Sequence, residues 1–388
     1  MAISNITRST VNLPELPQQQ PYLYKRQSAA TNFIEETLIR GTALPEPAKK
    51  LSFAIVEEKN GQQKLQLFYE NSNTEFSLEI PDLSKIAGNN KTARAFMTFA
   101  LVKINQQCIS QDNELYNDCI TFKVNDLVRS ADNPFGMYTD RSNARRGFVA
   151  GADVLTSLKI KGTAKGKKNN SFCAGLEVLF TGAEIKDNEC KLYLNDRINW
   201  PAMLPYITML PPYTMKLLIS NSKAGELVEY IFYMARQKQN AEQIKKTGCF
   251  KIPYKSIVER LNLPMDTKNP KRNVKDVIEK AIEAIETENS NAYHNDDFTI
   301  TPSNGDVSDI LPFKEWLEGY ITIEFKNEPR AFFADRATAR HKQIDKKRKA
   351  KDKAIEQNAA KSKPQIDNST ATDSGQQTIL AIDPQQVL

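Results

Sequence analysis

The chain has very few of the residues from which metal centres and disulfide frameworks are built. Its 388 residues include only two histidines, His294 and His341, which are far apart in the sequence. The five cysteines are odd in number, widely spaced, and contain no C-x-x-C pair. Zinc sites use closely spaced ligand pairs, and a disulfide framework uses an even set of cysteines. We therefore expect no metal site, no disulfide framework and no cofactor.

Long hydrophobic runs are also absent. No segment approaches the roughly 18 uninterrupted apolar residues that indicate a membrane helix. The N-terminal sequence MAISNITRST has neither the basic start nor the apolar run of a secretion signal. We expect a protein without membrane contact that works in the cytoplasm.

Catalytic signatures are missing as well. The segment Gly162-x-x-x-Gly166-Lys167 is one residue short of a phosphate-binding P-loop and has no Ser or Thr after the lysine. The closely spaced histidine pair of rolling-circle nicking enzymes is absent, and no Ser/His/Asp or Cys/His arrangement is indicated. We predict that the protein is not an enzyme, with a tyrosine-dependent nickase as a minor alternative.

The net charge of +6 is modest, but its distribution is uneven. Residues 159–168 (KIKGTAKGKK) carry five lysines and no acid, and residues 336–353 (RATARHKQIDKKRKAKDK) carry nine basic residues against two aspartates. Clustered positive charge is typical of proteins that bind a polyanion, most commonly nucleic acid. Either run alone also fits a solvated face or a solubilising tail.

Shifted by 130 residues without gaps, the middle of the chain repeats its apolar pattern. The matching residues are Met97, Ala100, Leu101 and Ile104 with Leu227, Tyr230, Ile231 and Met234; Phe122, Leu127 and Val128 with Ile252, Ile257 and Val258; and Ala144, Phe148 and Leu155 with Val274, Ile278 and Ile285. The polar residues between them are unrelated. This pattern predicts two copies of one small domain.

Each copy predicts the same order of elements. In copy one, helix, strand, short helix and long helix are expected at 91–107, 120–123, 125–130 and 140–157, with strands at 158–161, 174–184 and 191–194 after them. In copy two the helices and the first strand are expected at 222–239, 250–253, 254–261 and 272–288, with strands at 297–301 and 320–325. This is the order of a winged helix, in which the second and third helices form a helix-turn-helix and the hairpin is the wing.

The fold class that we predict is α+β, with two tandem winged-helix domains preceded by a small antiparallel sheet and flanked by disordered termini. Strands at 51–57, 64–69 and 75–80 form that sheet, and Asn60-Gly61 is a typical hairpin turn between the first two. The predicted domains are a disordered arm over 1–47, the sheet over 48–88, winged-helix domains over 89–196 and 197–330, and a basic then polar disordered tail over 331–388.

The third helix of copy one is predicted to display a basic face. If Ala144, Phe148, Ala152 and Leu155 face the core, a rotation of about 100° per residue turns other side chains outward. Those on the first turn and a half are Arg141, Ser142, Asn143, Arg145 and Arg146. Arginine suits guanine and asparagine suits adenine in the major groove. Ordinary solvated helix surface is the alternative.

Two further basic segments are predicted to contact DNA. The lysine-rich hairpin after this helix is interpreted as the wing, whose phosphate contacts would come from Lys159, Lys161, Lys165, Lys167 and Lys168. In copy two the start of the third helix is basic, through Lys268, Asn269, Lys271, Arg272 and Lys275. Its outward face then becomes acidic, so only the first turn is expected to reach DNA.

These patterns resemble a known family, the bacterial plasmid replication initiators (Rep) built from two winged-helix domains. The resemblance covers about residues 90–326. It rests on the duplicated skeleton, on WPAMLPYITMLPPYTMKLLISNSKAGELVEYIFYMARQ (Trp200 to Gln237) and on NVKDVIEKAIEAIETEN (Asn273 to Asn289). The extra sheet near 50–80, the acidic residues on the second recognition helix and the long basic tail depart from the family pattern.

The resemblance implies sequence-specific binding to short direct repeats, or iterons, at a plasmid origin, and opening of adjacent AT-rich DNA. It also implies recruitment of the host replication initiator and replicative helicase, and autorepression as a homodimer. The implied DNA contacts are the Arg141–Arg146 turn with its lysine hairpin, and the Lys268–Lys275 segment. We therefore predict a non-catalytic initiator of plasmid DNA replication that binds double-stranded DNA. A transcriptional repressor or partitioning protein of a mobile element, on the same scaffold, is the alternative.

Overall fold

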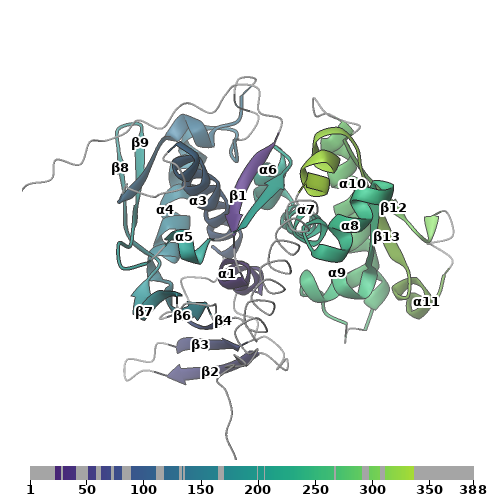
Figure 1. Cartoon of the computed structure of the whole chain (residues 1–388), viewed down its shortest axis with the longest axis horizontal. Helices are drawn as coiled ribbons and strands as arrows, with labels where there is room; N and C mark the ends of the chain where they lie inside the picture. The colour runs from purple at the N-terminus through teal and green to yellow at the C-terminus, as the bar shows by residue number, and fades with distance from the viewer. Residues whose placement is uncertain are drawn as a thin grey trace, which may run out of the picture. The chain divides into compact units, whose positions relative to one another are not determined.

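The structure, a computed structural model, combines helices with small antiparallel sheets (Figure 1), as the predicted α+β class requires. All described residues belong to the unit Met1–Ala337. They are residues 22–27, 29–40, 51–57, 63–70, 74–80, 89–110, 118–130, 133, 136–164, 170–198, 200–204, 206–265, 268–290, 297–305 and 311–335. No helix within these ranges has both the length and the apolar content needed to cross a membrane.

The first copy of the repeat encloses its apolar stripe. Its elements are α3 (Asn90–Ser110), β5 (Cys119–Lys123), η1 (Val124–Leu127), α4 (Arg141–Ser157), β8 (Phe180–Lys186) and β9 (Glu189–Leu194). The three strands form one sheet of order β5-β9-β8. Met97, Leu101 and Ile104 of α3 are fully buried, which confirms the predicted core face of this helix.

The second copy repeats this order of elements, with α8, η2 and α11 in addition. Its elements are α7 (Ser222–Ala235), α8 (Lys238–Thr247), β11 (Cys249–Pro253), α9 (Tyr254–Arg260), η2 (Lys271–Lys275), α10 (Asp276–Ser290), β12 (Phe298–Pro302), α11 (Phe313–Leu317) and β13 (Tyr320–Phe325). The sheet order is β11-β13-β12, which matches the order in copy one. Gly248, in the left-handed conformation, ends α8 and begins the strand.

The two three-stranded sheets also share their register. Cys119 lies opposite Tyr193 in copy one, and Cys249 lies opposite Glu324 in copy two. The offsets are 249 − 119 = 130 and 324 − 193 = 131. The two copies therefore share one strand order, and the pairing of β5 with β9 repeats in β11 and β13 at the spacing of the apolar pattern.

Aromatic rings pack in both cores. In copy one, Phe122 lies edge-on to Phe99 and Phe148, with ring centroids 4.8 and 5.7 Å away. In copy two, Phe232 and Phe325 have centroids 5.2 Å apart. Phe333 is fully buried 5.2 Å from Phe325, on a helix that spans 327–335. The predicted start of a disordered tail at 331 is therefore wrong for 331–335, because this ring completes the core.

The small N-terminal sheet is present, but it extends into copy one. Its strands β2 (Leu51–Glu57), β3 (Gln63–Glu70) and β4 (Thr74–Ile80) continue through β6 (Lys159–Ala164) to β7 (Asn170–Val178), in an antiparallel sheet of order β2-β3-β4-β6-β7. The lysine-rich hairpin β6–β7 therefore belongs to this sheet. The hairpin that pairs with β5 is β8–β9, so the predicted assignment of the wing to 159–168 is wrong. The long-range pairing of β6 with β4 places the β6–β7 hairpin in the five-stranded sheet.

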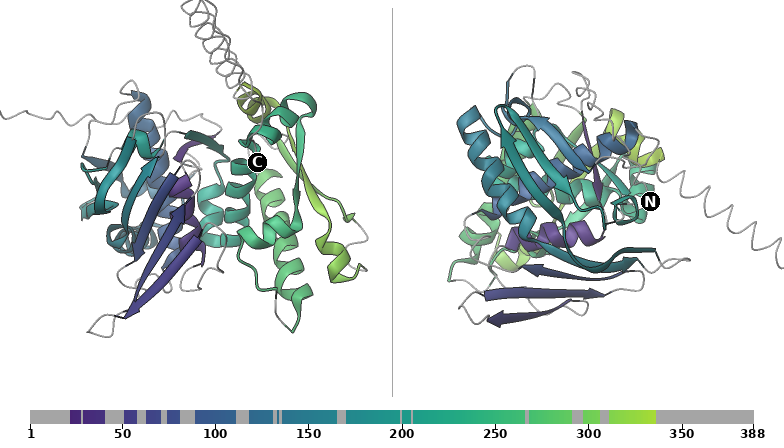
Figure 2. Two further views of the ribbon diagram at one scale, coloured as in Figure 1. Left: turned by 60° about the horizontal axis from the view of Figure 1, so that its bottom comes forward. Right: turned by 90° about the vertical axis from the view of Figure 1, so that its left-hand side faces the viewer.

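The predicted disordered arm over 1–47 is wrong for residues 22–40. β1 (Leu23–Gln27) pairs antiparallel with β10 (Tyr206–Leu210) and contacts α3. α1 (Ala29–Arg40) contacts both α3 and β4, and Figure 2 shows it lying over the N-terminal sheet. Its buried residues Ala30, Phe33, Ile34 and Leu38 follow helical spacing. Two short helices, α5 (Trp200–Met203) and α6 (Thr214–Ser220), flank β10.

A buried network of four charges joins β1 and α1 to both copies. Lys25 of β1 lies 2.8 Å from Glu229 of α7 and pairs with Glu35 of α1. Arg94 of α3 lies 2.8 Å from Glu35 and pairs with Glu229. Thr98 donates a hydrogen bond of 2.6 Å to Glu229. Two cations face two anions, so the buried charges balance, and the polar strand β1 can be buried without large apolar side chains.

Gly225, near the start of α7, allows α6 and α7 to approach closely. A Cβ at this position would lie 2.5 Å from the backbone nitrogen of Leu218. We expect Gly225→Ala to lower the free energy of unfolding by about 1–3 kcal/mol, because the helices must move apart. Urea denaturation measures the change. Gly182→Ala is the matched control, since its nearest neighbour is 3.7 Å from the added Cβ. Equal denaturation midpoints for the two variants would contradict the prediction.

Candidate nucleic-acid interface

The first turn and a half of α4 presents the predicted polar side chains. Asp140 caps the helix by accepting a hydrogen bond of 2.8 Å from the backbone nitrogen of Asn143. The predicted core residues Ala144, Phe148, Ala152 and Leu155 are all buried. Because they hold one face of the helix, the other face is directed to solvent, and it exposes Arg141, Ser142, Asn143, Arg145 and Arg146. The structure places these five residues together, while their contact with DNA stays a prediction.

Hydrogen bonds orient part of this face. Arg146 donates to the Asn143 side-chain oxygen over 2.6 Å, and the Asn143 amide nitrogen donates to Asp140. The hydrogen bond from the Asn143 backbone nitrogen lowers the pKa of Asp140, so its carboxylate is charged at neutral pH. Because its amide is engaged at both ends, Asn143 is better placed to position Arg146 than to pair with an adenine.

Arg145 connects α4 to the β8–β9 hairpin. Its guanidinium donates to the backbone carbonyl of Asp187, which has a positive φ of 54° in the turn of that hairpin. The long helix and the hairpin of the same three-stranded sheet are therefore adjacent at the basic end of α4. Arg145 has further donors for a second acceptor, because a guanidinium carries five N–H groups.

Val149 extends the exposed face by one turn and was not identified from the sequence. It lies three and four residues after Arg146 and Arg145, and 56% of its surface is exposed. Among the described residues, few large apolar side chains are as exposed. The helical spacing that places Arg145 and Arg146 on this face also places Val149 there, but an apolar residue in an apolar-striped helix carries no signal of exposure by itself. A branched apolar group on such a face can contact the methyl group of thymine.

The lysines of the β6–β7 hairpin lie in different environments. Lys159 is partly exposed and lies 3.3 Å from Glu79 of β4, so its charge is balanced within the five-stranded sheet. Lys161 is exposed on β6. The other three predicted phosphate contacts, Lys165, Lys167 and Lys168, lie outside the described residues. Lys159 and Lys161 therefore belong to the five-stranded sheet and not to the three-stranded sheet that adjoins α4.

In copy two, four of the five predicted residues are exposed. Lys268 and Asn269 precede the helix, and the Asn269 side chain accepts a 3.2 Å hydrogen bond from the backbone nitrogen of Arg272. Lys271 and Arg272 are exposed on η2. Lys275 is only 1% exposed and lies 3.9 Å from Glu279, so its prediction as a DNA contact is wrong. Lys275 lies on the π-helical turn η2, whereas the equivalent Arg145 is exposed on the regular helix α4.

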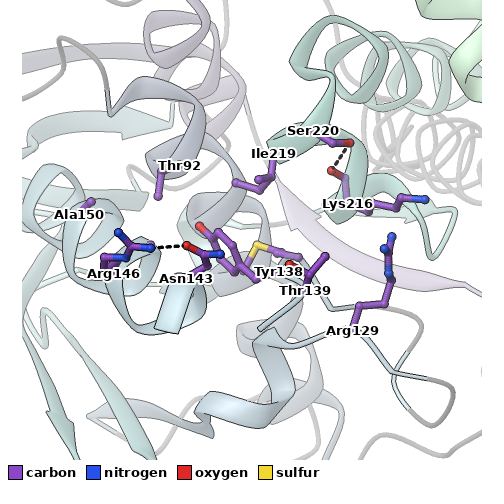
Figure 3. A pocket seen from close by; sticks show the side chains of 12 residues that line it. Thr92, Arg129, Tyr138, Thr139, Asn143, Arg146, Ala150, Lys216, Ile219 and Ser220 are labelled. Carbon is purple, nitrogen blue, oxygen red and sulfur yellow. Dashed lines mark hydrogen bonds between the residues drawn. The ribbon is translucent and has the colours of Figure 1, made fainter. Parts of the chain in front are cut away.

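A pocket of about 560 Å³ adjoins the basic end of α4 (Figure 3). It is bounded by the start of α3, the loop before α4, α4 itself and α6. Asn143 and Arg146 line it on one side, and Arg129 and Lys216 lie across from them. Arg129 and Lys216 were missed by the sequence analysis. They are 87 residues apart (216 − 129), on the loop before α4 and on α6, so no local pattern relates them.

The polar groups of the basic face and of the adjoining pocket are mainly hydrogen-bond donors. The basic face and the pocket provide guanidinium, ammonium and hydroxyl donors. Within the described ranges, no group of three or more His, Cys, Asp or Glu side chains is placed to hold a metal ion. Comparison with protein-family models gave no match, and comparison with curated proteins gave none either.

Proposed function

We propose that this protein binds double-stranded DNA sequence-specifically through two winged-helix domains and thereby initiates replication of a plasmid. The exposed basic face of α4, on a unit that the chain contains twice, carries the proposal. Two tandem units would bind successive sites along one duplex, as the direct repeats of an origin require. The protein would act without catalytic activity of its own, together with a host initiator and a replicative helicase.

The topology of each copy supports the winged-helix interpretation. In copy one, α3 is followed by β5, the turn η1 and α4, and the β8–β9 hairpin then pairs with β5. In this interpretation η1 and α4 form the helix-turn-helix, α4 is the recognition helix, and β8–β9 is the wing. The hydrogen bond from Arg145 to the backbone carbonyl of Asp187 supports this interpretation, because it joins α4 to the β8–β9 hairpin.

The second copy supports a smaller set of contacts. Lys268, Lys271 and Arg272 are exposed where η2 begins, whereas Glu283 and Glu286 are exposed further along α10. Phosphates would repel the acidic part of the helix. Copy two would therefore contribute phosphate contacts from one turn, and copy one would recognise most of the base sequence.

A footprint on the DNA that flanks the gene, at two salt concentrations, tests the proposed function. Several evenly spaced protected repeats would support an origin-binding initiator, and their spacing would show how the two copies are used. A single palindromic site over a promoter would favour a repressor instead. If the protein protects no sequence over random duplex, the proposal is wrong. Loss of replication on deletion of the gene separates an initiator from a repressor, for which only derepression is expected.

Val149 provides a test at the level of a single methyl group. We expect replacement of one particular thymine in the protected site by uracil, which lacks the methyl group, to weaken binding about fourfold, because one buried CH₂ or CH₃ contributes about 0.8 kcal/mol. Val149→Ala should weaken binding to the thymine site and remove the sensitivity to uracil. Phe68→Ala, which changes an exposed apolar side chain on β3, is the control. Equal sensitivity to uracil in all three proteins would contradict the contact.

A further inference from the structure

The pocket beside α4 has an unusual balance of charge. It is lined by the three cations Arg129, Arg146 and Lys216, and by the hydroxyl groups of Thr92, Thr139 and Ser220. Among its lining residues in the described part of the chain, none is acidic. Three cations around one cavity repel one another, and this repulsion is relieved when an anion enters.

The remaining ionisable group in the pocket is neutral. Burial raises the pKa of Tyr138 to about 12, so its phenol carries no charge at neutral pH. The Tyr138 hydroxyl packs against Gly147 of α4, where a Cβ would lie only 2.0 Å from the hydroxyl oxygen. Tyr138 therefore forms a fixed, uncharged wall of the pocket.

The three cations differ in how they are held. The Asn143 side chain orients Arg146 through a 2.6 Å hydrogen bond. Lys216 pairs with Glu288 of α10, which lies outside the pocket lining. An ammonium has three donors, so one bond to Glu288 leaves two for a ligand. Arg129, on the loop before α4, is drawn in Figure 3 with its guanidinium directed toward the side of Lys216.

We propose that this pocket binds a phosphate group. Guanidinium groups match the geometry of phosphate oxygens in bidentate pairs, and lysine adds a point charge. Asn143 and Arg146 belong both to the pocket and to the exposed face of α4. A DNA strand that crosses α4 therefore brings a backbone phosphate within reach of Arg129 and Lys216. If the phosphate comes from DNA, this inference rests on the proposed function. A soluble phosphate ester would supply the same chemical group without DNA.

The double variant Arg129→Gln/Lys216→Gln in the full-length protein tests this site. Its matched control is Lys238→Gln/Lys246→Gln, which removes two exposed positive charges from α8. For a DNA phosphate, we expect the pocket variant to bind the footprinted site at least about tenfold more weakly than the control, because hydrogen bonds to charged groups are strong. The slope of log K against log salt should become shallower by about 0.9 for each DNA phosphate that the variant no longer neutralises.

Inorganic phosphate, pyrophosphate and ATP, titrated by calorimetry without DNA, distinguish the two sources. Binding that the pocket variant loses and the α8 control keeps, with an unchanged salt slope on DNA, would support a soluble phosphate ester as the ligand. Pocket and control variants that agree in both experiments would overturn the proposal. If the wild-type protein recognises no DNA sequence, the proposed function fails, while the phosphate titration still tests the pocket.

Glu288→Gln shows whether a loss reflects the ligand or the fold. This variant breaks the same ion pair as Lys216→Gln but leaves the Lys216 ammonium in place. It should bind the phosphate source at least as tightly as the wild-type protein, because Lys216 no longer shares its charge with a carboxylate. If Glu288→Gln loses binding to the same extent as Lys216→Gln, the ion pair has only a structural role and the proposal is contradicted.

Discussion

Arg94→Met is expected to lower the free energy of unfolding by about 3–5 kcal/mol, because it leaves buried carboxylates without a balancing charge. Arg94 is 2% exposed and lies between Glu35 and Glu229, which are themselves buried. In the variant, Lys25 would be the only cation of the network left to balance the charges of Glu35 and Glu229. Since whole domains are stable by only about 5–15 kcal/mol, this loss is severe. Urea denaturation, with the slope compared between variants, measures it.

A second variant separates loss of the ion pair from loss of packing. Arg94→Met/Glu229→Leu removes one cation and one anion, and it leaves Lys25 paired with Glu35. Replacing both partners of a buried pair by apolar groups is often close to neutral. The double variant should therefore be more stable than Arg94→Met alone. If the double variant is as unstable as the sum of its single variants, the charges are not coupled and the network does not join the two copies.

The same network predicts how stability changes in acid. Burial alone would raise the pKa of Glu229, but the nearby charges of Arg94 and Lys25 outweigh this effect and lower the pKa below its usual value. A carboxylate with a lowered folded-state pKa stabilises the protein above its unfolded-state pKa, and this contribution is lost as the pH falls through the folded-state value. Wild-type stability should therefore decrease below about pH 4.5, the ordinary range of a glutamate. Urea midpoints between pH 3 and pH 7 test this, with Glu229→Gln expected to show a weaker dependence.

Arg146→Ala is expected to relax recognition at one base pair, at a cost of about 1–3 kcal/mol against the preferred base. Its guanidinium is exposed on α4 and held by Asn143, so it is oriented before any DNA is bound. Binding to a library of sites, each with one base pair changed, measures the effect. The loss should be confined to the changed position, because phosphate contacts elsewhere are unaffected.

Lys165→Gln/Lys167→Gln/Lys168→Gln is the contrasting change. If the turn of the β6–β7 hairpin contacts phosphates, this variant should weaken binding to every sequence equally and reduce the salt slope by about 0.9 per phosphate. Discrimination between bases should remain. Equal effects of the arginine and lysine variants on discrimination would contradict this division of roles. If the lysine variant binds DNA as tightly as the wild-type protein, the β6–β7 turn does not contact the DNA, and β8–β9 is the hairpin that remains for this role.

Local patterns in the sequence predicted many of the helices and strands and much of the candidate site. Apolar periodicity predicted α3, α4 and α10, and the 130-residue repeat predicted two copies whose sheets share one order. The exposed face of α4 followed from the same periodicity, because a helix of regular geometry relates side-chain direction to position. Three strands near 51–80 were also predicted, with bounds close to those of β2, β3 and β4.

Tertiary structure decided the features that depend on distant partners. β1 is polar and gave no strand signal; it is buried because Glu35, Glu229 and β10 provide partners for its charges and backbone. Because β6 pairs with β4, the β6–β7 hairpin belongs to the five-stranded sheet and not to the sheet that contains β5. Lys275, on the π-helical turn η2, is buried. The sequence by itself therefore determined much of the secondary structure, the repeated apolar pattern and the basic helix face, because these depend on local spacing along the chain. Only the tertiary structure decided which strands pair, which charges are buried and that Arg129 and Lys216 share a pocket, because these depend on contacts between residues far apart in the chain.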